Sequence, residues 1–111
     1  MHVHGAPDCA MLHRNMNTPP VPLQLSLEDL LGDLQHARRH QDMSRLALLA
    51  YCEVRRWARQ AGESALAERS AALVTRSPQA TREQFMAEVD ELIAQLQQAH
   101  GRLVVAAATA A

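Results

Sequence analysis

Apolar residues recur every three or four positions over most of the chain, and this is the spacing of one face of an α-helix. Residues that start or stop helices, among them Asp42, Gly62 and Pro78, separate the stretches that carry this pattern. The pattern predicts an all-α protein, a small antiparallel bundle of three or four helices with short loops. The expected helices cover residues 27–41, 45–61, 63–76 and 81–100.

The first two helices have clear expected boundaries and buried faces. Ser26 is the expected N-cap of the first helix, because Ser is favoured there and Glu28 and Asp29 follow in the first turn. The second helix is expected to begin near Arg45 with Asp42 or Ser44 as its cap. Gly62 either ends that helix or bends it. The buried stripes are Leu27, Leu30, Leu31 and Leu34 in the first helix, and Leu46, Leu49, Ala50, Val54, Trp57, Ala58 and Ala61 in the second.

The last helix has the most regular pattern. Thr81 and Gln84 have the spacing of a capping box, and Gly101 suits the position just after a helix end. The apolar residues follow a heptad, which favours packing inside the bundle but is also typical of pairing with a second copy, so a homodimer is predicted. This heptad seam consists of Phe85, Val89, Leu92, Leu96, Ala99 and Leu103, flanked by Met86, Ile93 and His100.

Both ends of the chain lack the helical pattern. Residues 1–25 contain four of the five prolines and are expected to form a disordered or extended arm. Residues 102–111 have no polar face and are expected to form a frayed, flexible apolar tail, or a short segment that docks on a partner. The helical bundle domain therefore covers residues 26–101.

Composition narrows the possible functions. With 48% hydrophobic and 21% charged residues and a net charge of −1, the chain is neither wholly disordered nor a strongly basic nucleic-acid scaffold. No apolar run is long enough to cross a membrane, and the N-terminus lacks the regions of a signal peptide, so a cytoplasmic protein is expected. Phosphate loops, nucleophile elbows and C-x-x-C pairs are missing, which favours a non-enzymatic protein without a cofactor.

One face of the first helix has residues that bind metals. Asp29, Asp33, His36 and His40 fall within about 60° of arc, opposite the leucine stripe. Two imidazoles one turn apart, with carboxylates beside them, can bind a divalent metal. The alternative is a solvated face with Asp–His pairs between turns.

The outer face of the second helix is rich in arginine. The chain has no lysine, and Arg45, Arg55, Arg56 and Arg59 fall within about 100° of arc, with Leu48 and Cys52 among them. Such a face could bind an acidic protein or phosphates. The small number of aromatic residues and the lack of a DNA-binding motif argue against nucleic acid as the partner. It could also be a solvent face neutralised in place, with Arg59 pairing Glu63. Cys52 is expected to be a half-buried, inert thiol rather than a reactive one.

These observations predict a small interaction or regulatory protein that acts through helix-mediated contacts with a protein partner or with itself. The arginine face would attract acidic partners. A metal-binding or metal-sensing protein that uses the first helix is the alternative function. Nucleic-acid binding through the second helix is a weaker one.

Overall fold

The computed structural model describes residues 22–75 and 81–110, and this part of the chain is helical throughout, apart from short turns. It confirms the predicted all-α fold. The predicted disordered arm lies outside the described residues except for 22–25. The helices are α1 (Leu23–Arg39), a continuous second helix made of α2 (Met43–Leu48), η2 (Leu49–Val54) and α3 (Arg55–Gln60), then α4 (Ser64–Thr75) and α5 (Arg82–Ala110).

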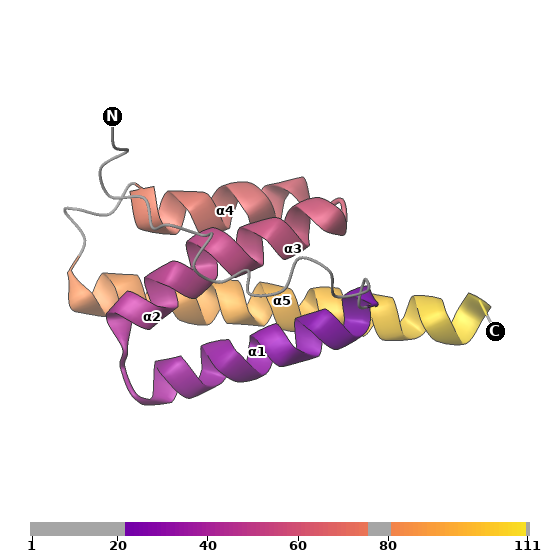
Figure 1. The fold of residues 1–111 in the computed structure, drawn as a ribbon, viewed down its shortest axis with the longest axis horizontal. Coiled ribbons are helices and arrows are strands. Elements are labelled where there is room, and N and C mark those ends of the chain that lie inside the picture. Colours follow the sequence, from indigo (N-terminus) through magenta and orange to yellow (C-terminus); the bar gives the residue numbers. More distant parts are fainter. Residues whose placement is uncertain (1–21, 76–80, 111) are drawn as a thin grey trace, which may run out of the picture.

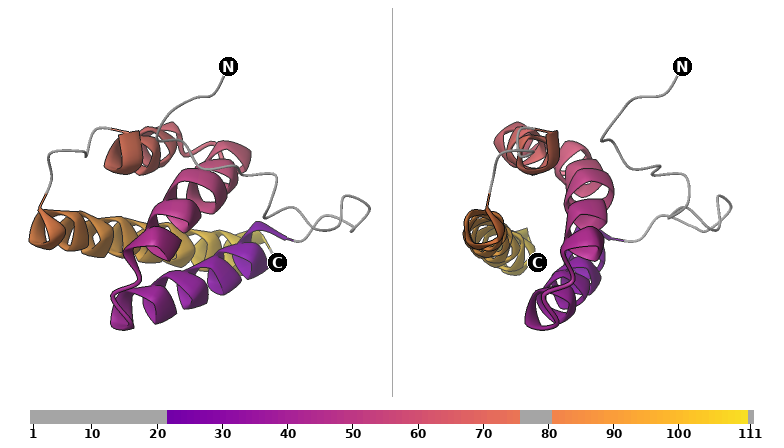
Figure 2. Two further views of the ribbon diagram at one scale, coloured as in Figure 1. Left: turned by 60° about the vertical axis from the view of Figure 1, so that its left-hand side comes forward. Right: turned by 90° about the vertical axis from the view of Figure 1, so that its left-hand side faces the viewer.

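The first three of these helices form a curved layer, and α5 lies along its inner side (Figure 2). α5 packs against α1 and α4, and α4 packs against η2 and α3 (Figure 1). Two side-chain contacts show the direction of α1 relative to α5. The Glu28 carboxylate lies 2.8 Å from the His100 imidazole, whereas Arg38, further along α1, forms an ion pair with the earlier residue Asp90. The two helices are therefore antiparallel, as predicted.

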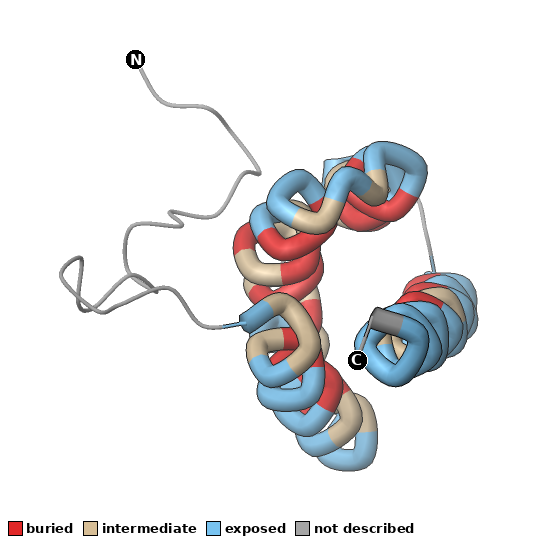
Figure 3. The backbone as a smooth tube through the Cα atoms, turned by 90° about the vertical axis from the view of Figure 1, so that its right-hand side faces the viewer, coloured by how far each residue is buried: buried red, intermediate tan, exposed pale blue. Residues whose placement is uncertain are grey.

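The apolar core lies between α5 and the curved layer. Figure 3 shows the buried residues on the sides of the helices that face α5. All four leucines predicted to line the first helix are buried. The predicted stripe of the second helix is confirmed as well, with Ala61 half-buried at its end. From the second helix the core takes Leu46, Leu49, Ala50, Val54, Trp57 and Ala58.

α1 begins four residues earlier than predicted, so the assignment of Ser26 as N-cap is wrong. The N-cap is Pro22, whose carbonyl accepts a hydrogen bond from the Ser26 amide at 3.1 Å. A proline suits this position because it has no amide hydrogen to leave unpaired. The Trp57 indole nitrogen donates to the Leu23 carbonyl at 3.0 Å and holds the extra turn against the second helix.

The turn between α1 and α2 is closed by hydrogen bonds at both helix ends. Gln41 has a positive φ of 52°, and the next amide, that of Asp42, donates back to the Ala37 carbonyl at 3.0 Å. The Asp42 carboxylate then accepts from the Arg45 amide at 3.1 Å, which confirms Asp42 as the N-cap of the second helix.

Gly62 ends the second helix rather than bending it. Its φ is 75°, a left-handed conformation that glycine adopts without strain. The Gly62 amide donates to the Arg59 carbonyl at 3.3 Å, and the Glu63 amide donates to the Ala58 carbonyl at 2.7 Å. This pair of bonds is a Schellman motif. The chain therefore turns back at Gly62, and α3 and α4 lie side by side.

The predicted capping box at the start of α5 is confirmed in both directions. The Thr81 hydroxyl accepts from the Gln84 amide at 3.1 Å, and the Gln84 side chain accepts from the Thr81 amide at 3.0 Å. Two amides at the helix start are thus satisfied by side chains. The predicted break at Pro78 lies outside the described residues.

Replacing Thr81 by alanine should lower the free energy of unfolding by about 1 kcal/mol, because the Gln84 amide loses its side-chain acceptor. Urea denaturation followed by circular dichroism measures this change. Thr81→Ser is the matched control and should retain most of the stability. Equal stability of the alanine and serine variants would contradict a role for the cap.

The heptad seam of α5 is buried inside the bundle. Val89, Leu92, Leu96 and Ala99 are at most 1% exposed, and Phe85 and Met86 are also buried. Of the two interpretations of this pattern, the structure therefore shows packing against the chain's own helices, and the seam is not available to a second copy. Leu103, the last seam residue, is half-buried.

α5 does not end at Gly101, so the prediction of a helix end there is wrong. The helix continues to Ala110 and passes beyond the bundle (Figure 1). A glycine inside a helix costs about 1 kcal/mol relative to alanine, and good helix formers on both sides, such as Ala99, Arg102 and Leu103, offset this cost. The predicted frayed tail is instead a helical extension, residues 102–110.

Candidate functional site

The structure divides the predicted arginine face into two parts. Arg55 and Arg59 lie next to each other along α3 and line a groove between α3 and α4, whereas Arg45 and Arg56 do not line it. The segment between Arg45 and Arg55 contains η2, a π-helix. Because a π-helix bonds each residue to the fifth along rather than the fourth, it has more residues per turn. The angular position of Arg45 relative to Arg55, predicted at about 100° per residue, is therefore wrong, because η2 lies between them.

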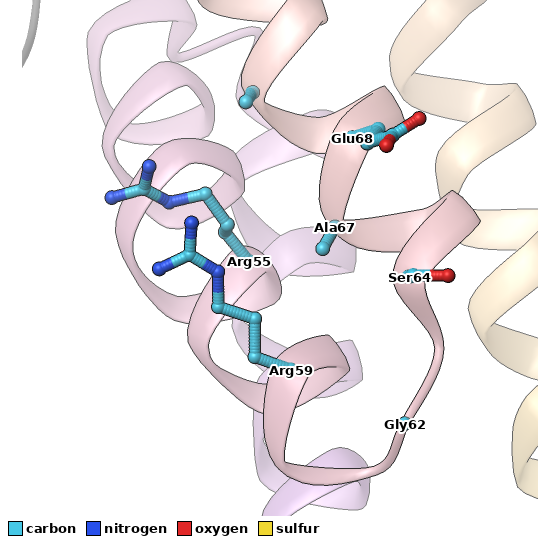
Figure 4. A pocket seen from close by; sticks show the side chains of 7 residues that line it. Arg55, Arg59, Gly62, Ser64, Ala67 and Glu68 are labelled. Atoms are coloured by element: carbon cyan, nitrogen blue, oxygen red, sulfur yellow. The ribbon is translucent and has the colours of Figure 1, made fainter.

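The groove has a volume of about 400 Å³. Ala67 is turned toward the two arginines, while Glu68 points away from them (Figure 4). The guanidinium group of Arg55 stacks on the Tyr51 ring, 4.1 Å from its centroid. This contact restricts the positions of the charge, as cation–π contacts do. The groove lining consists of Arg55, Arg59, Gly62, Ser64, Ala67, Glu68 and Ala71.

Three arginines outside the groove bind side chains of other helices or turns. Arg38 binds the Asp90 carboxylate through two nitrogens, at 2.7 and 3.2 Å, and this bond raises the pKa of Arg38. Arg82 donates to Gln41 at 2.6 Å, and Arg102 binds Glu63 across the fold at 2.9 Å.

None of the four arginines of the predicted face forms an ion pair with any residue in 22–75 or 81–110. The expected Arg59–Glu63 pair does not form, because Glu63 binds Arg102 instead. Within the described part of the chain, the arginine face is therefore not neutralised by ion pairs, and its charge is available to an anionic ligand or partner.

The other two members of the predicted face have different positions. Leu48 is half-buried. Cys52 is 3% exposed and forms a disulfide, so the expectation of a half-buried free thiol on the outer face is wrong. The one other cysteine of the chain, Cys9, lies outside the described residues.

The predicted metal-binding face of α1 is exposed at all four positions, Asp29, Asp33, His36 and His40. The rings of His36 and His40 lie 4.3 Å apart, and the His40 Nδ1 is 2.9 Å from the His36 carbonyl oxygen. Over residues 22–75 and 81–110, however, no three His, Cys, Asp or Glu side chains come together in a group that could hold a metal ion. The structure thus brings the two histidines together but assembles no metal centre there.

We expect zinc to leave the melting temperature of this protein unchanged. A ligand that binds only the folded state raises stability by about 2.7 kcal/mol at a hundredfold excess over its Kd, so a real site would be visible in a thermal melt. Differential scanning calorimetry with and without zinc measures the shift. A rise that the double variant His36→Ala/His40→Ala abolishes would contradict this expectation and establish the metal site.

A second exposed feature is the helical extension of α5. Val104 and Val105 are 42% and 65% exposed, and residues 106–109 are exposed as well. The one polar side chain after Arg102, Thr109, donates its hydroxyl hydrogen to the Val105 carbonyl at 2.6 Å. The sequence pattern predicted apolar character here but not the helix. The run of alanines that follows the two valines, residues 106–108, was the available signal.

Although α5 is 29 residues long, no described helix combines the length and hydrophobicity needed to cross a bilayer. The chain matches no family model, no curated protein and no solved structure.

Proposed function

We propose that this protein is a small, non-enzymatic interaction protein that binds a partner through helix-to-helix contacts. The observation that supports this function is the extension of α5 beyond the bundle, with two valines exposed on a helix that lacks a charged side chain after Arg102. Exposed apolar surface is unfavourable in water by about 25 cal/mol per Å². Its burial against an apolar helix face of a partner would therefore drive binding.

The groove arginines support the same function. Arg55 and Arg59 carry positive charge that no described carboxylate neutralises, on a chain whose net charge is −1. Charges arranged in this way speed and orient the approach of a partner with acidic side chains. The apolar extension would then provide most of the affinity, and the arginines would provide selectivity.

The test compares three forms of the full chain as bait in its native host, with chemical crosslinking and identification of the bound chains. They are the wild type, Val104→Asp/Val105→Asp, and Gln97→Asp/Gln98→Asp. The last adds the same two charges at exposed positions of α5 within the bundle.

We expect one specific partner bound by the wild type and by the Gln97/Gln98 control, and lost from the Val104/Val105 variant. Purified partner should then bind the purified wild type directly, with a Kd at least about tenfold lower than for the valine variant, which corresponds to about 1.4 kcal/mol. Identical binding of every partner by all three forms, or no specific partner other than a second copy of this chain, would overturn the proposal.

A further inference from the structure

The outer face of α1 has a row of three exposed residues four positions apart: Leu25, Asp29 and Asp33. Leu25 is 52% exposed, and Gly32, close to this row on the helix, has open space around it. Neither aspartate forms an ion pair with a described residue, whereas the neighbouring Glu28 binds His100 at 2.8 Å, which lowers the pKa of Glu28. We call Leu25, Asp29 and Asp33 the acidic row.

The groove between α3 and α4 has the opposite charge and the same spacing. Arg55 and Arg59 are also four positions apart on a helix, which places both pairs about 6 Å apart along their axes. Next to the arginines, the groove is lined by the small side chains of Ala67 and Ala71. Small residues let a second helix approach closely. An exposed leucine one turn before Asp29 could then contact these two alanines.

We infer that this protein forms a dimer in which α1 of each copy docks into the α3–α4 groove of the other. Asp29 and Asp33 of one copy bind Arg55 and Arg59 of its partner, and Leu25 packs on the alanines of the groove. This inference goes beyond the proposed function, because the contact uses α1 and the groove rather than Val104 and Val105. α1 and the α3–α4 pair belong to the same curved layer, and α5 lies on its inner side (Figure 2).

Charge and spacing favour a second copy as the occupant. An arginine binds a carboxylate with two parallel hydrogen bonds, so two matched pairs define one register of the docked helix. A second acidic pair, Glu88 and Glu91 on α5, also forms no ion pair with a described residue. Its members are three positions apart, and it has the polar Gln84 where the acidic row has Leu25. The acidic row is therefore the better match to the groove.

Because exposed charges contribute to the contact, the dimer should depend on ionic strength. The Debye length falls from about 14 Å at 0.05 M salt to about 4 Å at 0.5 M, so salt screens the four charge pairs of each dimer. Sedimentation velocity of the wild type should show a species of twice 12.3 kDa at low salt. We expect its dissociation constant to rise at least about tenfold at high salt.

The decisive test uses charge reversal and mixing. Arg55→Glu/Arg59→Glu places carboxylates opposite carboxylates, and Asp29→Arg/Asp33→Arg places guanidinium groups opposite guanidinium groups. Each variant alone should sediment as a monomer. In an equimolar mixture, both contacts between unlike variants are complementary again, so a dimer should reappear. Circular dichroism and melting temperature establish that each variant is folded.

Two control variants carry the same charge changes elsewhere. Arg45→Glu/Arg56→Glu and Glu88→Arg/Glu91→Arg should each form dimers like the wild type. A monomeric wild type at low salt, dimers of either reversed variant alone, or a mixture that stays monomeric would overturn the inference. The Val104→Asp/Val105→Asp variant should still dimerise. A failure here is thus distinguishable from a failure of the proposed function, which depends on those valines.

Discussion

Replacing Leu92 and Leu96 by alanine should each lower the free energy of unfolding by about 2–5 kcal/mol, so the double variant should be largely unfolded at room temperature. Both side chains are fully buried, in the part of α5 that lies against the curved layer. Alanine leaves a cavity that neighbouring helices fill only in part, because protein interiors are close-packed. Urea denaturation of the single variants measures the loss.

The matched control is alanine at Gln97 and Gln98, which are exposed positions of the same helix. These variants should change stability by less than about 0.5 kcal/mol. If Leu92→Ala or Leu96→Ala melts together with the wild type, then the seam of α5 is not buried as described.

Trp57→Ala should destabilise the protein by about 3–5 kcal/mol. The indole ring is buried in the core, and its nitrogen also donates to the Leu23 carbonyl in the first turn of α1. The variant therefore loses both apolar contact area and the bond that holds the start of α1. Because Trp57 is the only tryptophan, unfolding of the alanine variant must be followed by circular dichroism rather than by fluorescence.

Trp57→Phe separates the two contributions. Phenylalanine keeps much of the apolar volume but cannot donate, so we expect a smaller loss than for alanine, with about 1 kcal/mol of it due to the hydrogen bond. Hydrogen exchange of the α1 amides should become faster at residues 26–28, which follow Leu23. Unchanged exchange in this turn would mean that the indole does not hold it.

Features that depend on nearby residues were predictable from the sequence. The leucine stripes, the Asp42 cap and the Thr81–Gln84 capping box each depend on residues within a few positions of one another. The prediction of Ser26 as the N-cap of α1 was wrong because a helix can begin equally well after Pro22. The added first turn is held by Trp57, 34 positions from Leu23. The sequence around Ser26 has no information about that contact.

The candidate site was predictable in residue type but not in geometry. Arg55 and Arg59 were grouped correctly, because residues four positions apart on one α-helical segment lie on the same face. Arg56 is on the same segment but about 100° further around the helix, and it does not line the groove. Arg45 was misplaced relative to them, since the 3.6-residue period does not reveal a π-helix between them. The ion-pair partner of Glu63 also could not be predicted from neighbouring residues. Arg59 is four positions away in the sequence, but the fold brings Arg102 to 2.9 Å from the Glu63 carboxylate.

The position of α5 also affects how the chain folds during synthesis. α1, the second helix and α4 leave the ribosome before α5, the helix that covers their leucines. Contacts such as Arg38–Asp90 and Glu28–His100 join residues 52 and 72 positions apart, so they cannot form until most of the chain has emerged. Until α5 has emerged, the nascent chain therefore exposes the apolar faces that α5 covers in the folded protein, and such exposed surface favours aggregation.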